Sequence, residues 1–232
     1  MKIPQLEVRT LSDQIVEIVR ENIVSGAIPP DLPIRQDALA RELNVSKIPL
    51  REALARLEQD GLVVSHPNRG FSVRPMSWAE AEEIFALRLT IEPEAAAYAS
   101  LRASEAEQDA AREALARFDA AAQAQQPTVG MLNRIFHMAM VTPGHRPVTE
   151  SVVSRLHVMA DRYVRKHLEP NRRHLRAEAE HHDILDAWLG RKDATVRALV
   201  ARHLEHTLQD LRNELEILEG RPGRAAPSEK SA

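Results

Sequence analysis

Proline and glycine are distributed unevenly along this chain, and their positions constrain its fold more than any other feature of the sequence. After Pro75 the pattern is helical almost throughout, with breaks near residues 126–127, 143–147, 169–170 and 190. Before Pro75 the breaks come close together, at Pro29, Pro30, Pro33, Gly61, Pro67 and Gly70. Proline lacks the backbone N–H that a helix interior needs, and glycine favours turns. The chain is therefore predicted to be mainly α, with short elements first and long helices after them.

The apolar periodicity of the later part predicts six helices. They lie near residues 78–101, 104–124, 128–141, 147–168, 171–189 and 193–219. Two of them begin with a capping box, Ser77 with Glu80 and Ser104 with Glu107, in which each side chain satisfies a free backbone N–H near the other. Six such helices with short connections favour an antiparallel helical bundle.

These patterns divide the chain into three predicted parts. Residues 1–75 form one domain, residues 76–219 form the all-helical domain, and residues 220–232 form a disordered tail that is small, polar and contains Pro and Gly. No cysteine is present, so a metal must use histidine, carboxylate or amide ligands. Neither a signal peptide nor an apolar run of the ~18 residues that a membrane span needs is found. We expect a cytoplasmic protein without a membrane partner.

The first domain has the pattern of a winged helix-turn-helix. Apolar spacing predicts helices over residues 11–25 and 36–43, a turn at Asn44, and a helix from Ser46, a good N-cap, to Asp60. Two β-type runs, 62–64 and 71–73, then flank a turn and read as a hairpin wing with Arg69 at its tip. A small helical subdomain with solvated charges is the alternative, because the elements alone do not establish DNA binding.

The helix that starts after Ser46 separates its residues into two faces. Its inward positions are apolar: Leu50, Ala53, Leu54 and Leu57. Its outward positions cluster at the start: Ser46, Lys47, Ile48, Arg51 and Glu52. A recognition helix presents its N-terminal residues to the major groove of DNA in this manner. Net charge is only −3, so a DNA-binding face has to be local.

Three stretches of this domain carry a family resemblance. LARELNVSKIPLREAL (39–54), LEQDGLV (57–63) and PNRGFSV (67–73) resemble the GntR family of bacterial regulators in register and spacing. The departures are Asn44 for the usual Gly, Lys47 for Arg and Ile48 for Thr, which implies a changed operator sequence because lysine loses the two-pronged contact of arginine with guanine. The DNA-binding residues that the resemblance implies are Arg35, Ser46, Lys47, Ile48, Arg51, Asn68, Arg69 and Gly70.

The second domain resembles the all-helical C-terminal domain of the FadR-type GntR regulators, called FCD. The markers are FALRLTIE (85–92), NRIFH (133–137), EHHDILDA (180–187) and ARHL (201–204). Similar domains bind small organic acids, often beside a metal ion, and many carry Asp where this chain has Asn133. An amide oxygen is a neutral and weaker ligand than a carboxylate.

The residues themselves also favour a metal site. Asn133 and His137 are four residues apart and share a helix face, while His181 and His203 lie eleven residues either side of a turn near residue 192. All four should face the bundle core, and three histidines with one oxygen suit a divalent ion. We expect zinc, with nickel or manganese as alternatives. The competing interpretation is that some are ordinary core or surface histidines; His182 and His206 are interpreted as non-ligands.

Arg88 lies on an otherwise apolar helix stripe, so its charge needs an anionic partner. That partner is either an internal carboxylate, Glu92 or Glu150, or the carboxylate of an effector that also touches the metal. The sequence thus favours a homodimeric GntR/FadR-type repressor that binds a palindromic operator and responds to a small organic acid. A metal-dependent enzyme is less favoured, because no obvious general base lies beside the site, and a pure dimerisation module is a third hypothesis.

Overall fold

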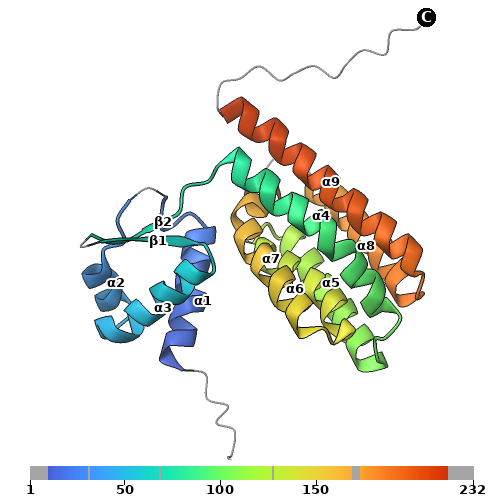
Figure 1. Ribbon diagram of the computed structural model, residues 1–232, viewed down its shortest axis with the longest axis horizontal. Coiled ribbons are helices and arrows are strands. Elements are labelled where there is room, and N and C mark those ends of the chain that lie inside the picture. Colours follow the sequence, from blue (N-terminus) through green and yellow to red (C-terminus); the bar gives the residue numbers. More distant parts are fainter. Residues whose placement is uncertain (1–9, 31, 68, 127, 169–172, 219–232) are drawn as a thin grey trace, which may run out of the picture.

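The computed structural model describes residues 10–30, 32–67, 69–126, 128–168 and 173–218, and it is mainly helical. Its N-terminal unit contains three helices and a two-stranded antiparallel sheet (Figure 1). The bounds are α1 Leu11–Val24, α2 Gln36–Glu42, α3 Lys47–Gln59, β1 Val63–His66 and β2 Gly70–Val73. The predicted winged helix-turn-helix is therefore confirmed as a fold. The predicted tail, 220–232, lies outside the described residues.

Local signals account for most of the N-terminal unit. Thr10 and Asp13 form a capping box at the start of α1. Asn44 adopts a left-handed conformation, with φ of 52°, in the turn between α2 and α3. Ser46 occupies the predicted N-cap position of α3, although its side chain makes no capping hydrogen bond.

The wing is docked on the segment that precedes α2. The strands pair from Val63 opposite Val73 to His66 opposite Gly70. The N–H of Ile34 donates to the carbonyl oxygen of Phe71 at 2.7 Å. Gly70 has φ of +82°, and a Cβ there would lie 2.8 Å from Nε2 of Gln36. Gly70 therefore shapes the wing beside α2, and a side chain at this position would be strained.

The C-terminal unit is the predicted bundle, and every predicted helix is present among the described residues. The bounds are α4 Trp78–Ser100, α5 Glu105–Gln123, α6 Val129–Val141, the 3₁₀ turn η1 Thr142–Gly144, α7 Pro147–Leu168, α8 Arg173–Leu189 and α9 Asp193–Leu218. In Figure 1, α4 and α9 run side by side along one side of this bundle, and α5, α6 and α7 lie on the other side of α4 from α9. Their packed faces bury an apolar core that includes Phe85, Phe118, Phe136 and Trp188.

One bundle helix, α7, contacts the N-terminal unit. Val158 is 5% exposed and belongs to the apolar cluster of α1 and α3, with Ile15 among its members. The Nη1 of Arg162 donates to the carbonyl oxygen of Arg74 at 2.5 Å, which fixes α7 to the connection after the wing. Val158 thus belongs to a helix of the bundle but packs in the core of the N-terminal unit. The division into two domains near residue 75 therefore stays a prediction. None of the described helices has the length and apolar character needed to cross a bilayer.

Candidate functional site

Three histidines from three helices meet inside the bundle. His137 of α6, His181 of α8 and His203 of α9 are 1%, 0% and 5% exposed. Each offers one ring nitrogen to a group in which all such atoms lie within 4.8 Å of one another. The Nε2 atoms of His181 and His203 are 3.2 Å apart. His181 and His203, which lie eleven residues either side of the turn between α8 and α9, thus face each other, as their spacing predicted.

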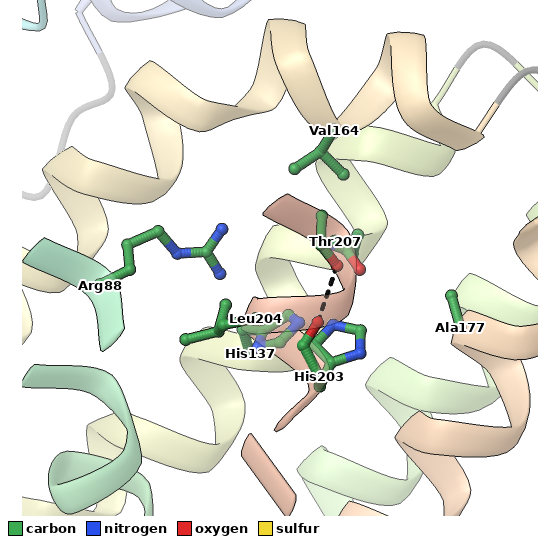
Figure 2. Close-up of a pocket in the computed structure, with 8 residues that line it drawn as sticks. Arg88, His137, Val164, Ala177, His203, Leu204 and Thr207 are labelled. Carbon is green, nitrogen blue, oxygen red and sulfur yellow. Dashed lines mark hydrogen bonds between the residues drawn. The ribbon is translucent and has the colours of Figure 1, made fainter. Parts of the chain in front are cut away.

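Asn133 lies one turn before His137 on α6 and lines the same small cavity. This cavity has a volume of about 10 Å³ and is also bordered by Arg88, His203 and Thr207. Figure 2 shows the guanidinium of Arg88 extending from α4 towards the space bounded by Thr207 and the two histidines. A volume of this size accommodates about one water molecule or ion. The cavity therefore has no room for an organic acid in this conformation.

A second cluster adjoins the first and contains two residues that the sequence did not assign to the site. Glu92 Oε1 lies 2.8 Å from Nδ1 of His137 and 3.1 Å from Nε2 of His157. The contact with His137 lacks the alignment of a hydrogen bond, because neither ring nitrogen of His137 has an aligned partner. His157 continues the buried stripe of Val153 and Ala160 on α7, so helical spacing offered a signal for it.

Arg88 finds its anionic partner inside the protein. Its Nε and Nη2 atoms lie 2.9 and 3.3 Å from the two carboxylate oxygens of Glu92, and both side chains are almost fully buried. Of the two internal carboxylates predicted as alternatives, Glu92 is thus the one observed, and Glu150 instead accepts a hydrogen bond from Thr142. Glu92 also overturns the expectation that no possible general base lies beside the histidines. Its carboxylate is, however, held by a permanent cation.

The electrostatics of the cluster keep His137 and His181 neutral and Glu92 ionised. Burial lowers the pKa of His137 to about 3 and lowers the pKa of His181 well below its usual value. Burial alone would raise the pKa of Glu92, but the charge of Arg88, helped by His157 and His137, holds it well below its usual range. Neutral imidazoles are the form that binds a metal ion.

The donor set fits a divalent ion. The two nitrogens of His137 are buried without an aligned hydrogen-bond partner, a state that costs free energy unless another group satisfies them. Ligand nitrogens about 2.0–2.1 Å from a tetrahedral zinc ion are separated by about 3.3 Å, close to the 3.2 Å between His181 and His203. His182 and His206 contact carboxylates outside this group, Asp119 and Glu180.

The start of α3 forms the exposed face predicted to contact DNA. Ser46, Lys47 and Arg51 are exposed, and Ile48 is 71% exposed, an unusual position for a large apolar side chain. Lys47 forms an ion pair with Asp37 of α2. Nε of Arg51 donates to Oε1 of Gln36 at 3.2 Å. Both basic side chains are therefore held by α2 at the edge of this face.

The remaining predicted contacts flank α3. Arg35 is exposed at the N-cap position of α2, and Arg69 is exposed in the turn of the wing. Gly70 begins β2. Asn68 lies outside the described residues. Lys47, Arg51, Arg35 and Arg69 thus supply exposed positive charge from three successive elements of the N-terminal unit.

Comparisons with known proteins agree with both halves of the fold. Bacterial regulatory proteins of the gntR family match residues 11–73, and the FCD domain matches residues 83–206, more than half of the chain. The HTH-type transcriptional regulator BphR of Paraburkholderia xenovorans (strain LB400) is 27% identical over 222 residues, which cover 90% of this chain and 89% of that protein. The HTH-type transcriptional repressor RspR of Escherichia coli (strain K12) is 26% identical over 206 residues, which cover 87% and 89%.

Among solved structures, E. coli McbR/YncC has a TM-score of 0.77 at 22% identity, over 88% of this chain and 98% of that one. This likeness supports the fold. The resemblance seen in the sequence motifs is confirmed by the two family matches. The chain therefore belongs to the GntR family of bacterial transcriptional regulators, with an FCD domain as its C-terminal part.

Proposed function

We propose that this regulator is a homodimeric repressor whose affinity for a palindromic operator changes when a small carboxylate binds in the FCD domain. The observation that carries the proposal is that α7 takes part in both sites. Val164 of α7 lines the cavity, His157 contacts Glu92, and Val158 packs in the core of the winged unit. A change at the cavity thus has a physical route to the DNA-binding face.

The proposed metal centre consists of His137, His181 and His203, with the amide oxygen of Asn133 as a fourth donor. Zinc is the first candidate, and nickel or manganese are alternatives. A bound ion would supply a Lewis acid that holds an effector carboxylate, and Arg88 would add a second positive charge at the cavity. The orphaned nitrogens of His137 support this proposal.

The size of the cavity supports the coupling. At about 10 Å³ it admits no organic acid unless the elements that line it move apart. One of these elements is α7, which Arg162 ties to the connection after the wing. An effector that binds better to the opened cavity would shift the population towards a different placement of the winged units.

Operator selection followed by gel-shift measurements at one fixed salt concentration tests the DNA-binding half of the proposal. Arg51→Ala should weaken specific binding by about 1–3 kcal/mol. Arg112, an exposed arginine of α5 paired with Asp109, provides the matched control, because Arg112→Ala removes equal charge far from α3. If Arg51→Ala and Arg112→Ala bind the operator with equal affinity, Arg51 does not contact the operator.

The effector half is tested with metal analysis and carboxylates. Protein prepared without chelator or a nickel column should contain about one divalent ion per chain, and His203→Ala should lose it. A panel of mono- and dicarboxylates should change the operator affinity of the wild type and leave that of His203→Ala unchanged. If the wild-type protein binds no metal in excess zinc, nickel and manganese, the histidine cluster is only a polar part of the core. That result would refute the effector half of the proposal.

A further inference from the structure

Glu180 lies immediately before His181 on α8 and contacts two histidines of α9. One carboxylate oxygen is 2.7 Å from Nδ1 of His203, and the other is 2.6 Å from Nδ1 of His206. The side chain of Glu180 is 12% exposed, so these contacts are partly shielded from water. Glu180 is the first residue of the FCD-like stretch EHHDILDA (180–187) and is not one of the predicted metal ligands.

The contact determines which nitrogen of His203 carries the proton. Each carboxylate oxygen of Glu180 faces an imidazole nitrogen, and a carboxylate accepts hydrogen bonds, so Nδ1 of His203 is the donor. A neutral imidazole that donates from Nδ1 has its free lone pair on Nε2. The Nε2 atom of His203 is the one that faces His181, at 3.2 Å. Glu180 therefore holds His203 in the tautomer and orientation that a metal ligand needs.

We propose that Glu180 is the positioning residue for His203 as a metal ligand. Histidines that bind metals commonly donate their second ring N–H to a carboxylate, which fixes the ring and raises its basicity. His206 lies on the outer side of Glu180, away from the proposed ion: its side chain is 43% exposed, and its Nδ1 contacts the oxygen of Glu180 that His203 does not use. Arg176 Nε, 3.7 Å from that same oxygen, adds a favourable charge.

Glu92 differs from Glu180 although it also lies beside a histidine Nδ1. Its carboxylate is paired with Arg88, and its approach to His137 lacks hydrogen-bond alignment. Glu180 has no such bidentate partner in the described part of the bundle and is directed at His203. The positioning role is therefore assigned to Glu180. It rests on the proposed metal centre.

The test compares two variants of the full-length chain. Glu180→Gln keeps the shape of the side chain but replaces the carboxylate with a neutral amide, and it should weaken zinc binding by about 10–100-fold. His206→Ala removes the outer contact of Glu180 and leaves the inner one, so its zinc affinity should stay within about threefold of the wild type. Affinity is measured by competition with a chromophoric chelator, and melting of the chelated variants checks that both are folded.

A second measurement is independent of whether Glu180→Gln folds. Long-range ¹H–¹⁵N correlation spectra of the zinc-loaded wild type should show His203 protonated at Nδ1 and bound to the metal through Nε2. Metal on Nδ1, or a Glu180→Gln variant that binds zinc as tightly as the wild type, would overturn the positioning role and leave the metal centre standing. Absence of any zinc binding by the wild type would instead overturn the metal centre, and the role of Glu180 with it.

Discussion

Arg88, which lines the candidate pocket, forms a buried ion pair with Glu92, and breaking this pair separates the structural role of Arg88 from its proposed role towards an effector. The two side chains are 2% and 1% exposed, and two guanidinium nitrogens lie within 3.3 Å of the carboxylate. Neither charge is solvated, so each depends on the other. Without Arg88, the carboxylate would retain only neutral imidazoles as neighbours.

The expected magnitude follows from this burial. Arg88→Met keeps the aliphatic stem and removes the charge, and Glu92→Met does the same for the carboxylate. Removing one partner of a buried pair costs about 3–5 kcal/mol, because the remaining charge is uncompensated. The double variant leaves neither charge and should therefore lose less free energy of unfolding than either single variant.

Urea unfolding of chelated protein measures these free energies. Both tryptophans of the chain, Trp78 and Trp188, lie in the bundle, so their fluorescence reports the domain that contains the pair. Losses that simply add in the double variant would refute the pairing. If the folded double variant still binds zinc but its operator affinity no longer responds to any carboxylate, Arg88 has the second role proposed for it.

Three further outcomes are expected. If Ile48 contacts a thymine methyl group, replacing single thymines of the operator by uracil should weaken binding of the wild type and leave Ile48→Ser unaffected; equal losses in both proteins would exclude the contact. Chelated protein should lose stability as the pH falls from 6.5 towards 3, by about 1.4 kcal/mol per pH unit for each of His137 and His181. The sign follows because His137, with a pKa of about 3, stays neutral in the fold while the unfolded chain takes up the proton; a flat profile would contradict it. Asn133→Asp should bind zinc more tightly in calorimetry, because it adds a negative charge at the cavity, and an unchanged affinity would place residue 133 outside the metal's ligands.

Local chemistry explains which features could be predicted from the sequence. Capping residues and breakers act within a few positions, so the helix limits followed from Ser104, Gly190 and similar residues. The left-handed turn at Asn44 also follows from one residue's conformational range. The convergence of His181 and His203 required only that two consecutive helices pack antiparallel, which their short connection implies.

The features that could not be predicted depend on helices that are distant in sequence. Glu92 and His157 meet because α4 packs against α7, and no local pattern fixes the relative rotation of two such helices. Whether Arg88 pairs internally or with an effector was open for the same reason. The burial of Val158 against α1 belongs to this class too, since the periodicity of α7 marks an apolar face without identifying what covers it.

The charges around the cavity connect these observations. Arg88 and Glu92 cancel each other, His137 and His181 are neutral, and Asn133 adds no charge. The two positive charges of a divalent ion in this space of about 10 Å³ would therefore be offset only in part, by the carboxylate of Glu180 behind His203. Burying such charge is costly unless an anion accompanies it. A carboxylate effector supplies that anion, and the ion in turn attracts the carboxylate. Metal and effector should therefore bind cooperatively. Since the cavity would have to open to admit the acid, we expect binding of both to displace α7 and its contact with the winged unit.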